Sequence, residues 1–317
     1  MDKDRRIFVA GHKGMVGSAI LRALKKDGYE NVILANRQEL DLRDETAVRE
    51  FFKEKKPEYV FLAAARVGGI KANMSFPAEF LRDNLMIQNN VIHYSYISGV
   101  KKLIFLGSSC IYPRDCQQPI KEEYLFTGPL EPTNEGYALA KIAGLRMVQY
   151  YFREHGLKSI CLMPCNLYGP NDNFDPESSH FFPALVKKFV DACDNNSASV
   201  TLWGTGNARR DLMHVDDLVR ALFFLLGKLD SPEIINISSG QDVSIRELAE
   251  LIARKVDFKG NIIWDTKMPD GMPRKYLDIT KLRNLGFQSQ ISLEDGVSAV
   301  IAEYRKLKNN KGEPAHE

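Results

Sequence analysis

The first half of this 317-residue chain predicts an α/β fold built on a doubly wound parallel sheet. Two observations carry the prediction. Short apolar or β-branched runs alternate with longer segments of helical periodicity, and a glycine-rich turn joins the first run to the first helix. Right-handed crossovers would order five or more such strands as in a Rossmann sheet. The expected strands are residues 7–10, 31–35, 59–63, 103–107 and 159–163.

Helical patterns separate these strands, at residues 15–26, 46–55, 79–98 and 134–155. The polar loop 171–179 then interrupts the alternation, so we place a domain boundary there. Residues 1–170 are expected to form a Rossmann domain, with a returning segment near 211–240, and residues 171–317 a smaller mixed α/β substrate domain. In the second half we expect helices at 181–191, 215–226 and 245–255 and strands at 200–203, 234–237 and 262–264.

Composition excludes several classes of function. The chain has 43 Lys and Arg against 41 Asp and Glu, so it lacks the strongly basic balance typical of nucleic-acid binding. No apolar run approaches the roughly 20 residues that span a bilayer. The apolar segment 7–10 is too short for a signal peptide, so we expect a cytoplasmic protein. Five cysteines without CxxC or Cys/His spacing predict free thiols and no structural metal.

The turn after the first strand reads GHKGMVG, a GxxGxxG motif that opens the first helix. The first glycine permits the turn, the second lets the backbone approach phosphate, and the third lets the helix pack on the strand. A pyrophosphate would lie on the helix N-terminus. The alternative is a glycine-rich turn that binds nothing. The candidate contacts are Gly11, His12, Lys13, Gly14, Met15, Val16 and Gly17.

The residues after the second strand favour NADP(H) over NAD. Asn36 and Arg37 stand where an NAD enzyme would place an acid on the adenosine ribose. An arginine there can pair with a 2′-phosphate, which a carboxylate would repel. The alternative is that Arg37 is a solvated loop charge. Asp41 and Leu42 follow where such folds cap the adenine.

Tyr137 and Lys141 predict an acid–base pair for carbonyl reduction. They are four residues apart and therefore share one helix face. We expect the ammonium, together with an oxidised nicotinamide, to lower the pKa of the phenol. Ser108 ends the fourth strand, where its hydroxyl can bind a substrate carbonyl oxygen while Tyr137 gives that oxygen a proton and hydride reaches the carbon.

Together the GxxGxxG turn, Ser108, the YxxxK pair and the PxNxYGP segment 164–170 resemble the extended short-chain dehydrogenase family over nearly the whole chain. Segments 11–20, 65–70, 108–113 and 269–275 are most similar to the GDP-L-fucose synthase branch of that family. The resemblance implies NADP(H)-dependent 3,5-epimerisation and C4 reduction of GDP-4-keto-6-deoxy-D-mannose. It also implies a homodimer in which helices 79–98 and 134–155 form a four-helix bundle.

Epimerisation needs two proton-transfer groups, because a ketone at C4 acidifies the hydrogens at C3 and C5 and each proton must return on the opposite face. The resemblance assigns the base to Cys110 and the acid to His180. The alternatives are that Cys110 is a buried inert thiol and that His180 is only a helix N-terminal residue. For the nucleotide end of the substrate, the resemblance selects Lys188, Trp203, Arg210 and an acid in the stretch from Asp270 to Asp278. Asp278 is the named candidate, and which acid of the stretch contacts the substrate stays open.

The full set of candidate cofactor contacts extends to the carboxyl ends of three further strands. It adds Ala64, Leu106, Gly107, Ser108, Ser109, Lys141, Pro164, Cys165, Asn166, Leu167 and His180. Asn84 has either a cofactor role or a place on the helix surface. Two other functions stay open: another nucleotide-sugar epimerase or reductase, for which a Cys110→Ser variant would keep its turnover, and a non-catalytic NADP-sensing regulator, for which the complete Tyr/Lys pair would be unusual.

Overall fold

The computed structural model describes residues 1–175, 178–268 and 270–310, and it confirms the predicted α/β class. Six parallel strands form the main sheet in the order β2-β1-β3-β4-β5-β9. Chain order reverses between β1 and β3, and in such sheets ligands bind beside the carboxyl ends of the strands at this point. The strands are β1 (Ile7–Ala10), β2 (Val32–Ile33), β3 (Tyr59–Leu62), β4 (Lys102–Leu106), β5 (Ser159–Pro164) and β9 (Ile234–Ile237).

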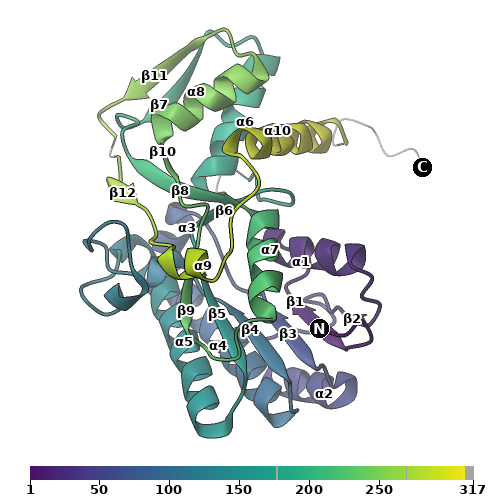
Figure 1. Cartoon of the computed structure of the whole chain (residues 1–317). Helices are drawn as coiled ribbons and strands as arrows, with labels where there is room; N and C mark the ends of the chain where they lie inside the picture. Colours follow the sequence, from purple (N-terminus) through teal and green to yellow (C-terminus); the bar gives the residue numbers. More distant parts are fainter. Residues whose placement is uncertain (176–177, 269, 311–317) are drawn as a thin grey trace.

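Helices cover both faces of this sheet (Figure 1). On one face α4 packs between α2 and α5, and on the other α1 packs against α7. All residues of β1 and β4 are buried between these layers, and all except Lys102 at the start of β4 are apolar, as is typical of a parallel sheet covered on both faces. The helices are α1 (Met15–Lys26), α2 (Glu45–Lys55), α4 (Pro77–Ile97), α5 (Glu135–His155) and α7 (Val215–Leu226).

The second strand is shorter than predicted. Residues 31–35 were expected to be extended, but β2 contains only Val32 and Ile33, because this edge strand pairs with β1 at two positions only. The chain then turns at Asn36, whose side chain accepts hydrogen bonds from the backbone N–H groups of Gln38 and Glu39. The short helix α3 (Ile70–Ser75) was not predicted.

The second half contains a small sheet that the sequence did not predict. Strand β8 (Arg209–His214) lies at its centre and pairs with β6 (Asn166–Tyr168), β10 (Asp242–Ser244) and β12 (Arg274–Lys275). Two further strands, β7 (Ser199–Trp203) and β11 (Asn261–Asp265), pair with each other. Around them pack α6 (Phe181–Asp194), α8 (Ile245–Val256) and α10 (Leu293–Asn310), of which α10 was also not predicted.

Two hydrophobic clusters divide the core. One surrounds the main sheet, and the other joins α6, α8 and α10. Segment 277–287, which includes the short helix α9 (Thr280–Asn284), packs into the first cluster although it lies within the range expected for the second domain. Within the described parts of the chain, no helix is both long enough and apolar enough to cross a membrane.

Candidate active site

The glycine turn is shaped by close backbone contacts and leaves one position open. Gly11 has φ +85°, and a Cβ there would lie 2.7 Å from the Ala64 nitrogen. A Cβ on Gly17 would lie 2.1 Å from the Gly11 oxygen, so both residues must be glycine to allow this packing. At Gly14, by contrast, a Cβ would have only an ordinary contact at 3.6 Å. Packing does not require this glycine, which is consistent with a ligand approaching the backbone there.

The N-terminus of α1 can hold an anion. Gly14 is the N-cap and provides no side chain to cap the helix, so the N–H groups of the first turn point outward. Lys13 precedes the cap. His12 has a buried Nδ1 without a partner among the described residues, and burial lowers its pKa.

Arg37 is free to reach a ligand. Its side chain is 71% exposed, and its nearest acid, Asp41, is 4.0 Å away. Asp41 itself pairs with Arg43, and hydrogen bonds from that guanidinium lower the pKa of Asp41 to about 2. Compared with Arg43, the Arg37 guanidinium is therefore only weakly paired with Asp41. It is available for the predicted contact with a 2′-phosphate.

Asn84 has a structural role in the fold. It is 2% exposed, accepts a hydrogen bond from the Arg66 backbone N–H at 2.8 Å and donates to the Arg66 carbonyl at 3.0 Å. A third bond, to Phe80, completes its contacts. Asn84 therefore anchors the segment after Ala64 and is not a surface amide.

Ser108, Cys110 and Tyr137 meet at the carboxyl end of β4. Ser108 caps a short 3-10 helix, residues Ser109–Ile111, by accepting a hydrogen bond from the Cys110 backbone N–H at 3.1 Å. Its hydroxyl is also hydrogen-bonded to the Tyr137 phenol, and Cys110 lies close enough to influence the titration of that phenol. The structure therefore brings two predicted catalytic groups and the predicted thiol into one place.

Lys141 joins α5 to this strand end. Its Nζ donates to the Leu106 carbonyl at 2.8 Å, and the residue is 5% exposed. No carboxylate pairs with it in the described chain. Burial consequently lowers its pKa to about 8.

The expected effect of Lys141 on the pKa of Tyr137 is not found. Burial, reinforced by the nearby Cys110, raises the pKa of Tyr137, and the hydrogen bond with Ser108 only partly opposes this rise. The ammonium lies 5.7 Å from the centre of the phenol ring and is committed to Leu106. In the protein alone, Tyr137 therefore keeps its proton over the whole neutral range.

Cys110 is half-buried, and two donors that the sequence analysis did not identify lie beside it. The Asn134 Nδ2 is 3.2 Å from the Cys110 sulfur, and the Lys275 Nζ is 3.7 Å from it. These contacts do not fit an inert core thiol. Lys275 belongs to the 269–275 segment that carried the family resemblance, of which Pro269 lies outside the described residues.

His180 is the N-cap of α6, as the structural alternative held, but its side chain is accessible to solvent. Protein atoms around it disfavour the imidazolium, and this desolvation lowers its pKa. The preceding loop contacts the turn before α3, where the Gly69 N–H donates to the Ser178 carbonyl at 3.0 Å. Residues 176–177 of this loop lie outside the described part of the chain. Among the described residues, no hydrogen bond or ion pair joins His180 to Cys110 or Tyr137.

The carboxyl end of β5 connects the main sheet to β8. The Cys165 N–H donates to Ile237, and the Asn166 side chain donates to the Asp211 carbonyl at 3.1 Å. Cys165 is buried, and burial raises the pKa of its thiol. Asp211 is buried as well, which raises its pKa to about 7. These side chains hold strands together, and contacts with a cofactor remain a prediction for the neighbouring Pro164 and Leu167.

The predicted nucleotide end lies on β7, β8 and α6. Lys187 is committed to Asp191 and Tyr304, whereas Lys188 is exposed and contacts only the Thr201 carbonyl at 3.1 Å. This agrees with the choice of Lys188. Trp203 is 65% exposed, as a stacking surface would be.

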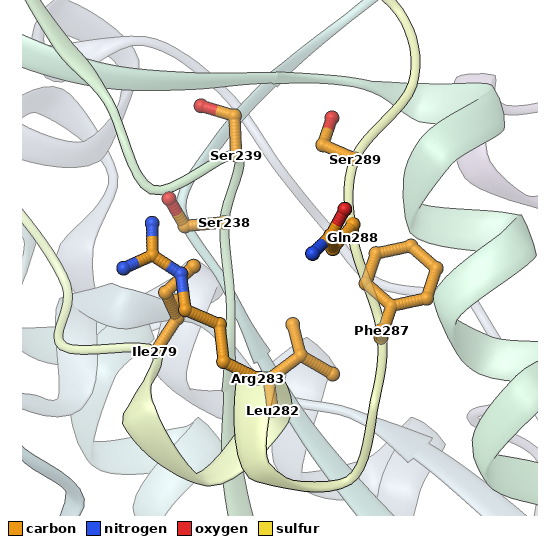
Figure 2. A pocket seen from close by; sticks show the side chains of 8 residues that line it. All are labelled: Ser238, Ser239, Ile279, Leu282, Arg283, Phe287, Gln288 and Ser289. Carbon is orange, nitrogen blue, oxygen red and sulfur yellow. The ribbon is translucent and has the colours of Figure 1, made fainter.

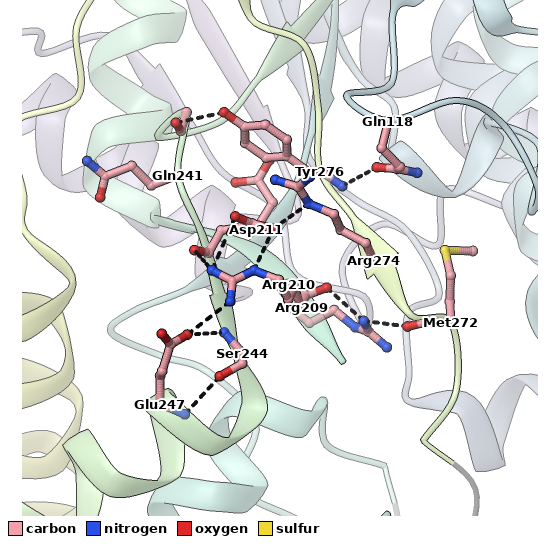
Figure 3. A network of polar contacts seen from close by, with 12 residues as sticks. Gln118, Arg209, Arg210, Asp211, Gln241, Ser244, Glu247, Met272, Arg274 and Tyr276 are labelled. Atoms are coloured by element: carbon pink, nitrogen blue, oxygen red, sulfur yellow. Dashed lines mark hydrogen bonds and ion pairs between the residues drawn. The ribbon is translucent and has the colours of Figure 1, made fainter. Parts of the chain in front are cut away.

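Figure 3 shows that the two adjacent arginines of β8 differ in their contacts. Arg209 pairs with Asp242 and Glu247, whereas Arg210 donates to the backbone carbonyls of Arg209 and Met272. The charge of Arg210 is therefore left without a bonded carboxylate in the described chain, and burial lowers its pKa. This favours Arg210 as the diphosphate contact.

Asp278 has a local structural role. Its carboxylate accepts a hydrogen bond from the Thr280 N–H at 2.8 Å at the start of α9, and no contact joins it to Arg210. Hydrogen bonds from Thr205 lower the pKa of Asp270, and the nearby charge of Arg210 lowers it further. Asp270 is thus better placed than Asp278 for the nucleotide end.

A cavity of about 270 Å³ lies beside α9 and contains none of the predicted site residues (Figure 2). Its polar groups include Ser238, Ser239 and Arg283, and Leu282 and Phe287 form an apolar wall. In the described chain, no group of three or more His, Cys, Asp or Glu residues could hold a metal ion.

The buried Lys141 predicts a gain in stability when its charge is removed. Below pH 8 the ammonium is charged in both the folded and unfolded chain, so folding carries the full cost of burying it. Between pH 8 and about 10.5 only the unfolded chain keeps the proton, and stability should rise with pH. We expect Lys141→Met to raise the free energy of unfolding at pH 7 by about 1–2 kcal/mol, the lost bond to Leu106 offsetting part of the gain.

Urea denaturation of the cofactor-free protein at pH 7 and pH 10 measures this effect. The difference between Lys141→Met and the unchanged chain should shrink at the higher pH. A variant that is less stable than the unchanged chain at pH 7 would contradict the expectation.

Comparison with known proteins agrees with the geometry. The model of the NAD dependent epimerase/dehydratase family matches residues 7–238. The chain is 53% identical to GDP-L-fucose synthase 1 of Arabidopsis thaliana, over 96% of this chain and 94% of that protein. It is 46% identical to GDP-L-fucose synthase of Escherichia coli strain K12, over 93% of this chain and 95% of that protein.

A solved structure is similar over the same length. The chain superposes on MlghC, described as a GDP-mannoheptose C4 reductase from Campylobacter jejuni with NADP bound, with a TM-score of 0.89 and 40% identity, covering 96% of this chain and 99% of that one. The family match and these identities show that the chain belongs to the NAD-dependent epimerase/dehydratase family, in the branch of the GDP-L-fucose synthases.

Proposed function

We propose that this protein catalyses the NADPH-dependent 3,5-epimerisation and C4 reduction of GDP-4-keto-6-deoxy-D-mannose to GDP-L-fucose. One observation carries the proposal. The reducing set of Ser108, Tyr137 and Lys141 and a thiol with its own hydrogen-bond donors, Cys110, share the carboxyl end of β4. Relatives at 46–53% identity are named GDP-L-fucose synthases, which supports this choice of substrate.

The glycine turn and Arg37 fit NADP(H). The first-turn N–H groups of α1 would bind the pyrophosphate, Gly14 leaves room for its approach, and Arg37 would pair with the 2′-phosphate. When bound, the reduced cofactor supplies hydride to C4 of the sugar.

In the reduction, the Ser108 and Tyr137 hydroxyls would bind the C4 oxygen of the substrate. The high pKa of Tyr137 keeps its proton in place until negative charge develops on that oxygen, which then takes the phenolic proton. The Lys141 ammonium, fixed by Leu106, stabilises the phenolate that remains.

In the epimerisation, the Cys110 thiolate would remove the acidified proton at C3 or C5, leaving an enolate. His180 would return a proton on the other face. Because surrounding protein atoms partly desolvate His180 and lower its pKa, its imidazole is mainly neutral in the protein alone. The negative diphosphate of a bound substrate would favour the imidazolium and so prepare the acid.

At the nucleotide end, Arg210 and Lys188 would bind the diphosphate, and Trp203 would offer an exposed aromatic surface beside it. Arginine suits this role because its planar guanidinium binds phosphate through paired hydrogen bonds.

A second candidate is a C4 reductase without epimerase activity. The observation in its favour is the similarity to MlghC, which carries that description. The two functions differ in their dependence on Cys110, since a reductase alone has no need of this thiol.

We also propose a cytoplasmic homodimer. All five cysteines are free, which suits a reducing compartment. The long helices α4 and α5 pack together and expose Ile97, Leu139 and Tyr150, apolar surface that a four-helix bundle would cover. Sedimentation should give a dimer at micromolar concentration, and a monomer would contradict this proposal.

Exchange with D₂O tests both halves of the reaction. Incubation with GDP-4-keto-6-deoxymannose and NADPH should place deuterium at C3 and C5 and consume NADPH. Tyr137→Phe should keep the exchange but lower NADPH consumption by at least about 100-fold, because only the proton donor for C4 is lost. Cys110→Ser should lower the exchange by a similar factor.

The outcomes separate the candidates. Absence of exchange in the unchanged protein would remove the epimerase half. Full turnover by Cys110→Ser would favour the reductase. Full activity of Tyr137→Phe would remove the reductase mechanism and revive the NADP-sensing regulator.

The choice of cofactor depends on Arg37. Arg37→Ala should weaken NADPH binding by about 10-fold or more, because a charge-assisted pairing with the 2′-phosphate is lost, and should leave NADH binding nearly unchanged. The matched control is Arg49→Ala, an exposed arginine on α2. Fluorescence titration measures both cofactors, and an equal loss for NADPH and NADH would contradict the assignment.

A further inference from the structure

Strand β12 brings a lysine from the far end of the sequence to the thiol at the end of β4. Lys275 and Cys110 are 165 residues apart, yet the lysine Nζ lies 3.7 Å from the sulfur. From another direction, the Asn134 Nδ2 lies 3.2 Å from the same sulfur. The sulfur thus accepts from one neutral and one cationic donor.

Lys275 is held in place by the backbone on both sides of it. Strand β12 pairs with β8, with Lys275 in register with Arg210. The next N–H, of Tyr276, donates to the Gln118 side chain at 2.9 Å, as Figure 3 shows, and the following N–H, of Leu277, donates to the buried Asp211. Because the backbone on both sides of Lys275 is already fixed, contact with Cys110 restricts only the side chain of Lys275.

Alternation along the strand directs this lysine toward the thiol. Arg274 pairs with Asp242, and the Tyr276 hydroxyl donates to the Gly240 carbonyl. Successive side chains of an extended segment point to opposite faces, so Lys275 points away from both neighbours. The face it reaches is the one that carries Cys110.

We propose that Lys275 is a positioning residue that holds Cys110 in its thiolate form, ready to accept a proton from the substrate. The use of that thiolate as the epimerase base rests on the proposed function. An ammonium within about 4 Å of a sulfur stabilises the negative form, and a thiolate is the form that acts as a base.

Among the groups around Cys110, only Lys275 of the described residues can stabilise the thiolate with a positive charge. Asn134 is neutral. Tyr137 keeps its proton, and Lys141 is committed to Leu106. Cys116 also lies near Lys275, whose charge lowers the pKa of that thiol, although the larger effect of burial raises it. Of the described charged groups, Lys275 is thus the cation bonded to Cys110.

The proton balance of the step is simple. The C–H bond at C3 or C5 breaks, its electron pair moves into the enolate of the ketone, and the proton forms an S–H bond on Cys110. Lys275 keeps its protons throughout. Strand β12, which carries Lys275, also lies beside the proposed diphosphate contact. Lys275 is in register with Arg210, and Arg210 donates to the Met272 carbonyl.

Alkylation measures the thiolate directly. The rate of iodoacetamide reaction at Cys110, followed by mass spectrometry of its peptide, rises with pH as the thiol loses its proton. We expect Lys275→Met to move the midpoint of this rise upward by roughly one pH unit, and Lys275→Arg to stay close to the unchanged chain. Lys281→Met, an exposed lysine on α9, is the matched control and should have no effect.

Equal midpoints for Lys275→Met and the unchanged chain would overturn the proposal, as would a midpoint for Lys275→Arg as high as that of Lys275→Met. NADPH binding identifies a variant that fails to fold. Lys275→Gln then replaces Lys275→Met, because its amide keeps a donor without the charge, and the same upward shift is expected.

The pH profile of deuterium exchange separates this inference from the proposed function. In Lys275→Met, the rising limb of the exchange rate should move by the same amount as the alkylation midpoint, with about a 10-fold loss at pH 7. An unmoved limb would overturn the inference while the function stands. A shifted alkylation midpoint without exchange in any variant would reject the function and leave the role of Lys275 in place.

Discussion

The hydrogen bond from Lys141 to the Leu106 carbonyl organises the site. It ties α5 to the last residue of β4, and so fixes Tyr137, one helical turn before Lys141, over the residues that follow the strand. Ser108 and Cys110 are the first and third residues beyond the next glycine. Together with the contacts between α5 and the 3-10 helix of residues 109–111, this bond holds the phenol, the hydroxyl and the thiol at one strand end.

Burial has opposite effects on the pKa values of the two members of the Tyr137/Lys141 pair. It lowers the pKa of Lys141 to about 8, and burial raises the pKa of Tyr137. In the protein alone, Lys141 therefore loses its proton more easily than a free lysine, and Tyr137 gives up its proton less easily than a free tyrosine. Both shifts favour a site that changes its charges only when a ligand supplies them: negative charge on a substrate oxygen takes the phenolic proton, and the ammonium then gains a phenolate neighbour. The cost in stability is the kind that active sites typically carry.

Local patterns predicted most of the sheet and the elements that bear the motifs. Each buried strand of the first half reads as an apolar run, and the YxxxK pair falls on one helix face because helical spacing places it there. The small sheet could not be predicted in this way, because β12 has two residues and its pairing with β8 depends on the tertiary fold. Side-chain contacts between residues far apart in the sequence also depend on the tertiary fold, so local patterns could not predict them. No local signal shows that Lys275 meets Cys110, that Asn84 is buried or that the Asp278 carboxylate accepts a hydrogen bond from the Thr280 N–H.

The two proposed chemistries depend on different parts of the fold. Ser108, Tyr137 and Lys141 lie on the end of β4 and on α5, so the reducing set is complete within the main sheet and its helices. Cys110 lies on the same strand end, but its cationic partner comes from β12, which pairs with β8 and not with the main sheet. A change in how the small sheet packs would therefore alter the thiol and leave the phenol in place. The proposed epimerase base thus depends on the pairing of β12 with β8, the strand that also carries Arg210, whereas the residues of the reducing set do not.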